Sequence, residues 1–210
     1  KKLGENVKID IAGYYTLLDN AMVRRDFTLN GATEIMYDGE LSRVQAIQNA
    51  ANAKVYGFQA GIVVKLPSGF NFSTDLNFQK GEEELDNGAK SASRHAAPFF
   101  GISRIGYRTS KLDMQINVQF SDAVAYKNLA EEEKGKTEIY ATDSNGNPYA
   151  PSWYTLNLKT MYKLTDNFTL TAELENITDQ RYRPYSSGIV SPGKNFIMAL
   201  RAKKKKKKIP

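Results

Sequence analysis

Arginine and tyrosine residues form the two groups of side chains in this sequence that are best suited to binding a ligand. They are Arg181, Tyr182, Arg183 and Tyr185 in one segment, and Arg24, Arg25 and Tyr37 in another. A guanidinium binds carboxylate, catecholate and phosphate groups through a rigid fork of donors, and an aromatic ring offers broad apolar contact. Both groups are therefore ligand candidates for an anionic chelate. The competing interpretation is that they decorate a surface and bind nothing.

The other polar clusters give weaker signals. The single histidine, His95, follows Arg94, and we interpret it as a solvated loop residue, with a haem or metal contact as the alternative because histidine is a common ligand. The glutamate runs at 82–84 and 131–133 lack the ligand spacing and turn glycine of a calcium site, so solvated loops are expected there. Gly146 belongs to a segment that weakly resembles a calcium loop, and we favour a plain turn.

No catalytic set of residues is found. The chain contains no cysteine and one histidine, which excludes disulfide frameworks and thiolate metal sites. We therefore predict that the protein is not an enzyme, and we predict no metal site and no cofactor.

The composition favours a folded protein of the β class. Of 210 residues, 41% are hydrophobic and 25% charged, and the mean hydropathy is −0.50. No apolar run approaches the roughly 20 residues of a transmembrane helix, but a transmembrane barrel hides its apolar half in alternation. The choice is thus between a soluble β protein and a transmembrane β-barrel.

The net charge of +6 comes from one end of the chain. The lysines at 203–208 account for six positive charges, so the remaining chain is formally neutral and offers no basic face for nucleic acid. This tail is either a polybasic segment at a membrane surface or a non-native addition, and we favour the second. We divide the chain into strands at 1–202 and the lysine-rich tail at 203–210. Its abrupt start, without a signal peptide, suggests a piece of a longer protein.

Hydrophobic periodicity predicts about eight strands that would position these residues. A period of two is typical of a strand with one apolar and one polar face. At 153–164 the apolar face is aliphatic between Tyr154 and Tyr162, whose spacing corresponds to roughly 20 Å of height, close to a bilayer's apolar band. The expected strands are 7–27 with a bulge near Asp19, 43–66, 70–78, 96–109, 112–121, 153–164, 168–176 and 195–201.

The connections alternate between short turns and long loops. Turns are expected at Pro67, Ser110 and Asp166, and long loops at 28–42, 80–95, 122–152 and around Ser186. Transmembrane barrels alternate in this way, with short periplasmic turns and long extracellular loops. Polar and charged residues in the middle of the strands fit a watery or plugged lumen better than a dry core.

Two linked motifs near the end of the chain resemble those of TonB-dependent outer-membrane receptors. The family's penultimate strand ends in N-[LIV]-x-D-x-x-Y, matched by Asn176, Ile177, Asp179 and Tyr182. Its last strand opens with P-G-R-x-[FY], matched by Pro192, Gly193 and Phe196, with Lys194 in place of arginine. A third motif, N-x-x-x-A-x-x-x-G-[FVI]-E, is matched by Asn49, Ala53, Gly57 and Phe58, with Gln59 in place of glutamate. The aromatic residue that normally ends the family's last strand is missing before the lysine tail.

This resemblance implies an all-β fold: an antiparallel transmembrane barrel, of which these are the C-terminal eight of roughly 22 strands. It implies active uptake of an iron chelate, haem or similar large nutrient across the outer membrane of a Gram-negative bacterium. Partners would be outer-membrane lipid, an extracellular ligand, the TonB system through an N-terminal plug that this chain lacks, and an accessory lipoprotein in some systems. The alternatives are a small eight-stranded structural or adhesive barrel, which would pair its first strand with its last, and a soluble β-sandwich.

Overall fold

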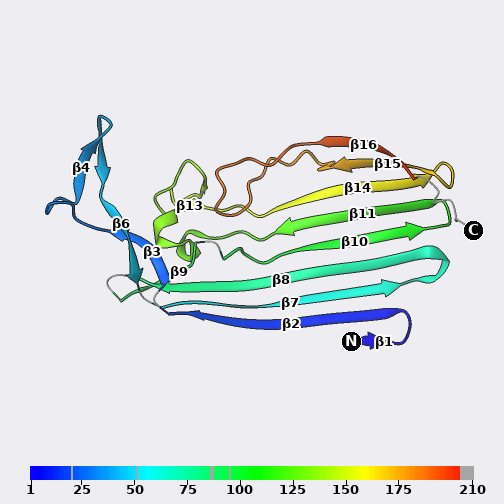
Figure 1. Ribbon diagram of the computed structural model, residues 1–210, viewed down its shortest axis with the longest axis horizontal. Coiled ribbons are helices and arrows are strands. Elements are labelled where there is room, and N and C mark those ends of the chain that lie inside the picture. Colours follow the sequence, from blue (N-terminus) through cyan, green and yellow to red (C-terminus); the bar gives the residue numbers. More distant parts are fainter. Residues whose placement is uncertain (20, 51, 86–87, 95, 204–210) are drawn as a thin grey trace, which may run out of the picture.

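One antiparallel sheet dominates the computed structural model, which describes residues 1–19, 21–50, 52–85, 88–94 and 96–203. Its strands run in the order β1, β2, β7, β8, β10, β11, β14, β15, β16, and β9 pairs with β8 (Figure 1). The bounds are β1 (Lys2–Leu3), β2 (Val7–Leu18), β7 (Ala53–Lys65), β8 (Phe70–Glu84), β9 (Lys90–Ala92), β10 (Phe100–Arg108), β11 (Leu112–Ser121), β14 (Trp153–Lys163), β15 (Phe168–Glu175) and β16 (Asn195–Ala202). Within the described residues, no helix is long and apolar enough to cross a membrane.

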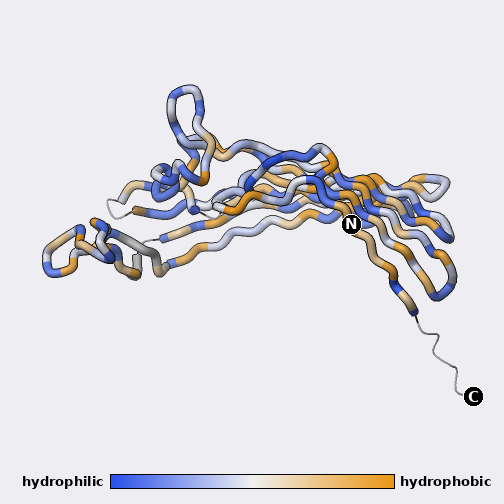
Figure 2. Tube along the Cα trace, turned by 90° about the horizontal axis from the view of Figure 1, so that it is seen from above, coloured by the Kyte–Doolittle hydropathy of each residue, from blue (hydrophilic) through white to orange (hydrophobic). Residues whose placement is uncertain are grey.

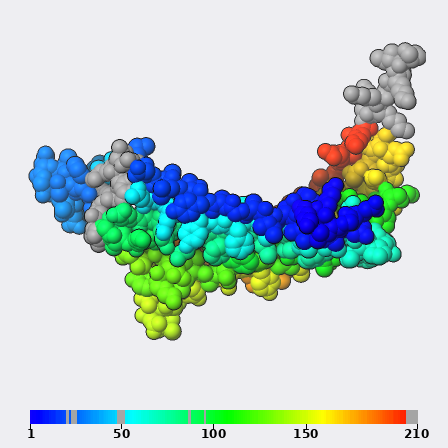
Figure 3. Space-filling model, turned by 90° about the horizontal axis from the view of Figure 1, so that it is seen from below, coloured from blue at the N-terminus to red at the C-terminus, as the bar shows by residue number. Residues whose placement is uncertain are grey.

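The eight long strands of this sheet confirm the predicted all-β class and strand number. In the described residues β1 and β16 lie at opposite edges of the sheet, so the first and last strands do not pair with each other. That finding contradicts the small closed barrel. The other sheets of the described residues have two strands each and none of them covers the main sheet as a second layer, which also contradicts the sandwich. Figure 3 shows the sheet curving up towards its β16 edge, drawn in red, while the β11–β14 connection around residue 140 projects from the other side.

The strand register puts apolar and polar side chains on opposite faces. Between β11 and β14, Ile116 lies opposite Leu158, and the next pair, Asn117 and Asn157, lies on the other face. Figure 2 shows the resulting alternation along the strands. The apolar face is exposed, whereas the buried apolar residues found among the described ones are few: Ala53, Val124, Leu129, Ala130 and Ala150. An exposed apolar surface of this extent is typical of a protein that contacts lipid.

The two ends of the sheet differ as the predicted alternation requires. At one end, short turns join β7 to β8, β10 to β11, and β14 to β15 (Figure 1). The hydroxyl of Thr109 accepts the N–H of Leu112 at 3.0 Å, and that of Thr165 accepts the N–H of Phe168 at 3.1 Å, so the same side-chain device closes two of these turns. The long connections belong to the other end, and they carry the ligand candidates that the structure describes.

The segment predicted as a loop at 28–42 contains a β-hairpin. β4 (Glu34–Tyr37) pairs with β5 (Glu40–Arg43), and below it β3 (Ala21–Asp26) pairs with β6 (Gln45–Ala50), which together form a hairpin that projects from the sheet (Figure 1). The predicted strands 7–27 and 43–66 were therefore too long, because β3 and β6 leave the main sheet. The turn at Asp38 and Gly39 has φ values of 52° and 84°, as the Asp-Gly dipeptide of a hairpin turn requires.

Two further boundaries differ from the prediction. β8 continues to Glu84 and turns back into β9, so most of the expected loop at 80–95 is strand or hairpin. The long connection at 122–152 contains the short 3₁₀ helices η2 (Tyr126–Asn128) and η3 (Glu131–Glu133) and the two-residue strands β12 (Ala141–Thr142) and β13 (Pro148–Tyr149). Another 3₁₀ turn, η1 (Pro67–Gly69), joins β7 to β8.

Gly57 is a family-motif residue whose role follows from the register. Tyr14 on β2, Gly57 and Gln79 on β8 lie in one row across three strands, and the Tyr14 hydroxyl donates to Gln79 Oε1 at 3.1 Å. The tyrosine can reach across β7 only because Gly57 has no side chain: a Cβ there would lie 2.7 Å from the Tyr14 hydroxyl and closer still to the Phe78 carbonyl oxygen.

Replacing Gly57 with alanine is expected to destabilise the sheet by about 1–3 kcal/mol, because either the tyrosine or the β8 backbone must move. The fraction of the protein that keeps the electrophoretic mobility of its folded form, measured over a temperature series, would report this loss. Gly13→Ala is the matched control, since a Cβ at Gly13 meets only an atom 3.9 Å away. Equal melting of the two variants would refute the steric explanation.

Candidate functional site

A cleft of about 300 Å³ lies between the β11–β14 connection and the β15–β16 loop, and we call it the loop cleft. It is lined by all four ligand candidates of the β15–β16 loop, namely Arg181, Tyr182, Arg183 and Tyr185. Tyr140 and Trp153 come from the opposite side. The structure thus brings one predicted group together and adds two aromatic residues that the sequence had not singled out.

The aromatic lining of the loop cleft is fixed by stacking. Tyr182 stacks on Trp153, the first residue of β14, with ring centroids 4.2 Å apart. Because the ladder between β11 and β14 pairs Trp153 with Ser121, the indole has a rigid base. The stack therefore anchors the β15–β16 loop to the end of the sheet.

The two arginines of the loop cleft differ in how they are held. Arg183 is half-buried, and its Nη1 donates to the Glu138 carbonyl oxygen at 2.9 Å, which ties the two connections together. Arg181 is exposed at the cleft lining. A cleft of this kind combines a positive charge at the surface with aromatic walls, which suits an anionic ligand with flat rings.

Glu133 holds the loops around the cleft together. It is the largest side chain found fully buried among the described residues, at 0% exposure. Its Oε1 pairs with Arg94 Nε and Lys136 Nζ, each at 2.6 Å, and its Oε2 accepts from the Tyr140 hydroxyl and from Ser186 Oγ, the latter at 3.4 Å. We call this cluster the carboxylate clasp. Its members come from three connections of the sheet: 85–99, 122–152 and 176–194.

The electrostatics of the clasp keep its carboxylate charged. Burial raises the pKa of Glu133, but hydrogen bonds from Lys136 and Tyr140 and the charge of Arg94 outweigh it and leave this pKa below its ordinary value. Burial, with the hydrogen bond to Glu133, raises the pKa of Tyr140 far above its ordinary value, so the phenol stays protonated and donates. A solvated loop was expected for the glutamates at 131–133, and for Glu133 that expectation was wrong.

A small apolar core lies next to the clasp. Val124, Leu129 and Ala150 form a buried cluster against which Tyr140 and Tyr185 pack. The two tyrosine rings lie 6.5 Å apart between centroids. Burial, and then the charge of Glu133, raises the pKa of Tyr185. The β11–β14 connection is thus a packed structure rather than the charged loop that composition suggested.

A larger cavity of about 910 Å³ lies against the polar face of the sheet, and we call it the sheet cavity. Gln59, Asn77 and Gln119 line it from three strands, and Asn77 Oδ1 is a buried acceptor without a hydrogen-bond partner among the described residues. Trp153, Pro184 and Tyr185 line both the sheet cavity and the loop cleft. Those three residues are therefore the wall between the two spaces.

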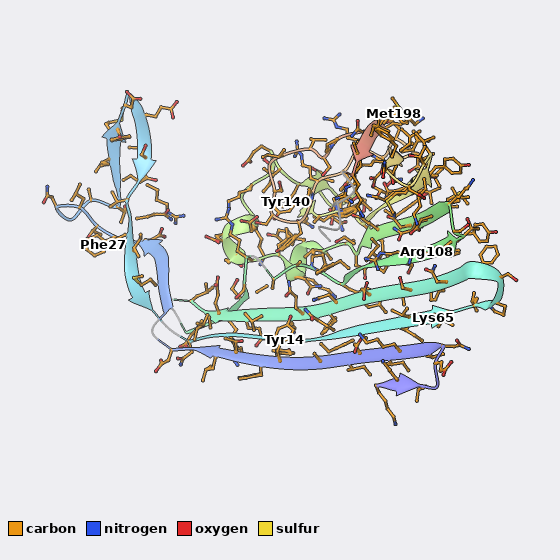
Figure 4. The ribbon with its side chains drawn as sticks, turned by 45° about the vertical axis from the view of Figure 1, so that its right-hand side comes forward. Tyr14, Phe27, Lys65, Arg108, Tyr140 and Met198 are labelled. Carbon is orange, nitrogen blue, oxygen red and sulfur yellow. The ribbon has the colours of Figure 1, made fainter. Side chains whose placement is uncertain are left out.

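The other predicted ligand candidates are not brought to this site. Tyr37 is 71% exposed on β4, and the backbones of Arg24 and Arg25 lie on β3 of the projecting hairpin. Figure 4 shows Phe27 on that hairpin, far from Tyr140 in the loops. His95 lies outside the described residues, as do all residues of the lysine tail beyond Lys203.

The family-motif residues form a network at the base of the β15–β16 loop. The Asn176 side chain donates to the carbonyl oxygens of Gln180 and Pro192 and accepts from the Gln180 N–H. Asp179 Oδ1 accepts from the Lys194 N–H at 2.8 Å, and a Cβ at Gly193 would lie 2.6 Å from that oxygen, which explains the glycine. Phe196 is 60% exposed on the apolar face of β16.

Two residues of the third motif lie where the chain re-enters the main sheet. Ala53 is buried, at 7% exposure, where β7 begins, and Asn49 lies on β6, where only its backbone is described.

The segment that weakly resembles a calcium loop is a turn. In it, Asp143 Oδ1 accepts the backbone N–H groups of Asn145 and Asn147, as in an ordinary turn. Over the part of the chain that the structure describes, no group of three or more acidic or histidine side chains is placed to hold a metal ion.

Comparison with known proteins adds a family and a fold. Residues 2–177 match a family model described as TonB dependent receptor-like, beta-barrel. No curated protein matches the chain. Among solved structures, the copper transporter OprC is similar over 95% of this chain with a TM-score of 0.72 and 12% identity. The FrpB iron transporter from Neisseria meningitidis gives a TM-score of 0.66 at 13% identity over 95% of the chain.

A siderophore receptor is also similar in fold. PiuA from Acinetobacter baumannii matches 96% of the chain with a TM-score of 0.60 and 16% identity. The chain spans only 30% of OprC, 28% of FrpB and 26% of PiuA. At these identities the likeness shows a shared fold, and the shares show that this chain corresponds to part of each barrel.

Proposed function

Since the chain belongs to the TonB-dependent receptor β-barrel family, we propose that it is part of an outer-membrane transporter that takes up an anionic iron chelate or haem. Members of this family lie in the outer membrane of Gram-negative bacteria and are transporters rather than enzymes. The exposed apolar face of the sheet accords with that location. The observation that carries the ligand proposal is the loop cleft, where Arg181 and Arg183 meet the aromatic rings of Tyr140, Trp153 and Tyr182.

The position of the cleft supports a role in uptake. It lies at the end of the sheet with the long connections, which is the extracellular end in transmembrane barrels. Only the wall of Trp153, Pro184 and Tyr185 separates it from the sheet cavity. A ligand held in the cleft would therefore rest directly above the lumen through which it must pass.

The remaining partners follow from the same proposal. The family's N-terminal plug would fill the sheet cavity, and a donor from it would satisfy Asn77 Oδ1. The TonB system would act through that plug, and an accessory lipoprotein would deliver ligand in systems that use one. Several solved transporters of similar fold are named for iron or siderophores and one for copper, so the growth test has to distinguish uptake of iron from uptake of copper.

The test uses the full-length receptor in a strain that lacks its own copy. Under iron limitation, with the iron(III) complex of 2,3-dihydroxybenzoate as the only iron source, the receptor is expected to restore growth. Arg181→Gln with Arg183→Gln is expected to weaken binding of this complex about tenfold or more, because hydrogen bonds to charged groups contribute about 1.5–3 kcal/mol each.

The matched control removes the same charge elsewhere. Arg43→Gln on the projecting hairpin loses only a pair with Asp26 and should bind the complex as the wild type does. Normal growth of the deletion strain on every iron source would sink the iron proposal. Uptake of copper with no uptake of iron would replace the metal while leaving the transport role in place.

A further inference from the structure

The wall between the loop cleft and the sheet cavity has one rigid part and one part that belongs to a loop. Trp153 is held by the ladder of β14. Pro184 and Tyr185 lie in the β15–β16 loop, outside any strand. If the two spaces are to connect, the segment 184–186 is the part that must move.

The carboxylate clasp holds that segment from two sides. Glu133 Oε2 accepts from Ser186 Oγ, the residue after Tyr185, and also from the Tyr140 hydroxyl. The Tyr140 ring packs against Tyr185. Arg94 adds a second contact to Ser186, with Nε donating to Oγ at 3.4 Å. One buried carboxylate therefore fixes both faces of the wall's movable part.

The clasp also joins connections that are distant in the sequence. Arg94 comes from the β9–β10 connection, whereas Lys136 comes from the same connection as Glu133. A separate hydrogen bond, from the Glu131 N–H to Ser91 Oγ at 2.9 Å, ties β9 itself to η3. Removing the Glu133 charge would leave Arg94 and Lys136, both half-buried, facing each other without the buried anion that they share.

We propose that Glu133 is a positioning residue that keeps the wall closed by holding Tyr140 against Tyr185 and by holding Ser186, so that the three connections open and close as one unit between cleft and lumen. The role of this wall as a gate for ligand rests on the proposed function, whereas its closure by the carboxylate clasp does not. Charge-assisted hydrogen bonds are the strong ones, and elements that gate a site are held by few such contacts.

The sequence offers matched controls for this proposal. Glu131, Glu132 and Glu133 are consecutive, yet Glu132 is 49% exposed and Glu131 59% exposed, while Glu133 is fully buried. The change Glu→Gln is the same at all three positions. In the detergent-solubilised full-length receptor, amide hydrogen exchange of residues 182–187 is expected to accelerate at least about tenfold in Glu133→Gln and to stay at the wild-type rate in Glu131→Gln, whose carboxylate pairs with Lys134 outside the clasp. Glu132→Gln removes only a longer pair with Arg94, at 3.7 Å, and should accelerate this exchange much less than Glu133→Gln. Exchange in β11 and β14 should not change.

Tyr140→Phe and Ser186→Ala test the same proposal if Glu133→Gln fails to fold. Each removes one contact with Glu133 and keeps its ion pairs with Arg94 and Lys136. Both are expected to accelerate exchange at 182–187, by a smaller factor than Glu133→Gln. Wild-type protection of 182–187 in all three variants would overturn the proposal, as would equal acceleration in Glu132→Gln.

A kinetic readout separates a positioning role from a merely structural one. With the iron(III)–dihydroxybenzoate complex as probe, Glu133→Gln should raise the association and dissociation rates together and leave Kd within about threefold, since no residue of the cleft lining is removed. A weakened Kd with unchanged rates of association would contradict the gate. If the probe does not bind the wild type but exchange at 182–187 responds as expected, the clasp stands and the proposed function falls.

Discussion

Arginine in place of Ile116 is expected to destabilise the barrel by about 2–4 kcal/mol, because it would put a charge near the middle of the bilayer. Ile116 lies on the apolar face of β11, directly opposite Leu158 of β14 and 44% exposed. Leu158 is midway between Tyr154 and Tyr162, which mark the two aromatic belts on that strand. An arginine side chain at position 116 would therefore have to extend far along the strand before its guanidinium reached water.

The control uses the same substitution on the other face of the same strand. Gln119 lines the sheet cavity on the polar face, away from lipid, so Gln119→Arg should lose clearly less stability than Ile116→Arg. The measurement is the urea concentration at which the full-length receptor, reconstituted in lipid vesicles, loses the electrophoretic mobility of the folded barrel. Similar losses for both variants would show that the two faces had been assigned wrongly.

The same alternation explains how much of the fold was predictable. A strand with one face in lipid and one in water must alternate strictly, so residues such as those around Ile116 identify both the strand and its face. The projecting hairpin obeys no such constraint, since neither face of β4 or β5 packs on a core. Its only strong local signal was the Asp38-Gly39 turn. For that reason the sequence predicted the eight long strands and missed β4 and β5.

The candidate site was predictable only where its residues are neighbours in the chain. Arg181 to Tyr185 form one loop, so their proximity needed no tertiary information. Predicting the carboxylate clasp would need tertiary information, because Arg94, Glu133 and Ser186 meet across three connections. In the sequence, nothing distinguishes Glu133 from Glu132. The other predicted group, Arg24, Arg25 and Tyr37, lies on β3 and β4 of the projecting hairpin, away from the loop cleft.

Family motifs gave a different kind of information, since they marked positions without explaining them. The structure explains Asn176. It is 4% exposed and has a φ of 46°, a left-handed conformation that asparagine tolerates better than most residues. Its own N–H donates to Asn157 Oδ1 at 2.8 Å, which fixes the end of β15 to β14. Its side chain then closes the start of the β15–β16 loop onto the residue before Gly193.

Asn176→Ala is accordingly expected to cost roughly 3–5 kcal/mol. The substitution removes two donated hydrogen bonds, at 2.8 and 3.2 Å, and one accepted bond at 3.0 Å. It leaves the Gln180 N–H and two carbonyl oxygens without these partners and places a Cβ on a left-handed backbone. Because the loop that carries Arg181 and Tyr182 starts here, the loss should appear both in the urea midpoint and in faster hydrogen exchange at 177–192.

Asn176→Gly divides this cost into its two causes. Glycine loses the same three hydrogen bonds but adopts a positive φ freely, so it should be more stable than alanine at this position by about 1 kcal/mol. The destabilisation that Asn176→Gly still shows relative to the wild type is the contribution of the three side-chain hydrogen bonds. If both variants unfold at the wild-type urea concentration, the network adds nothing and the motif asparagine must serve another purpose. If alanine and glycine are equally destabilised, the backbone conformation is not the reason for asparagine, and the hydrogen bonds to Gln180 and Pro192 alone account for the motif.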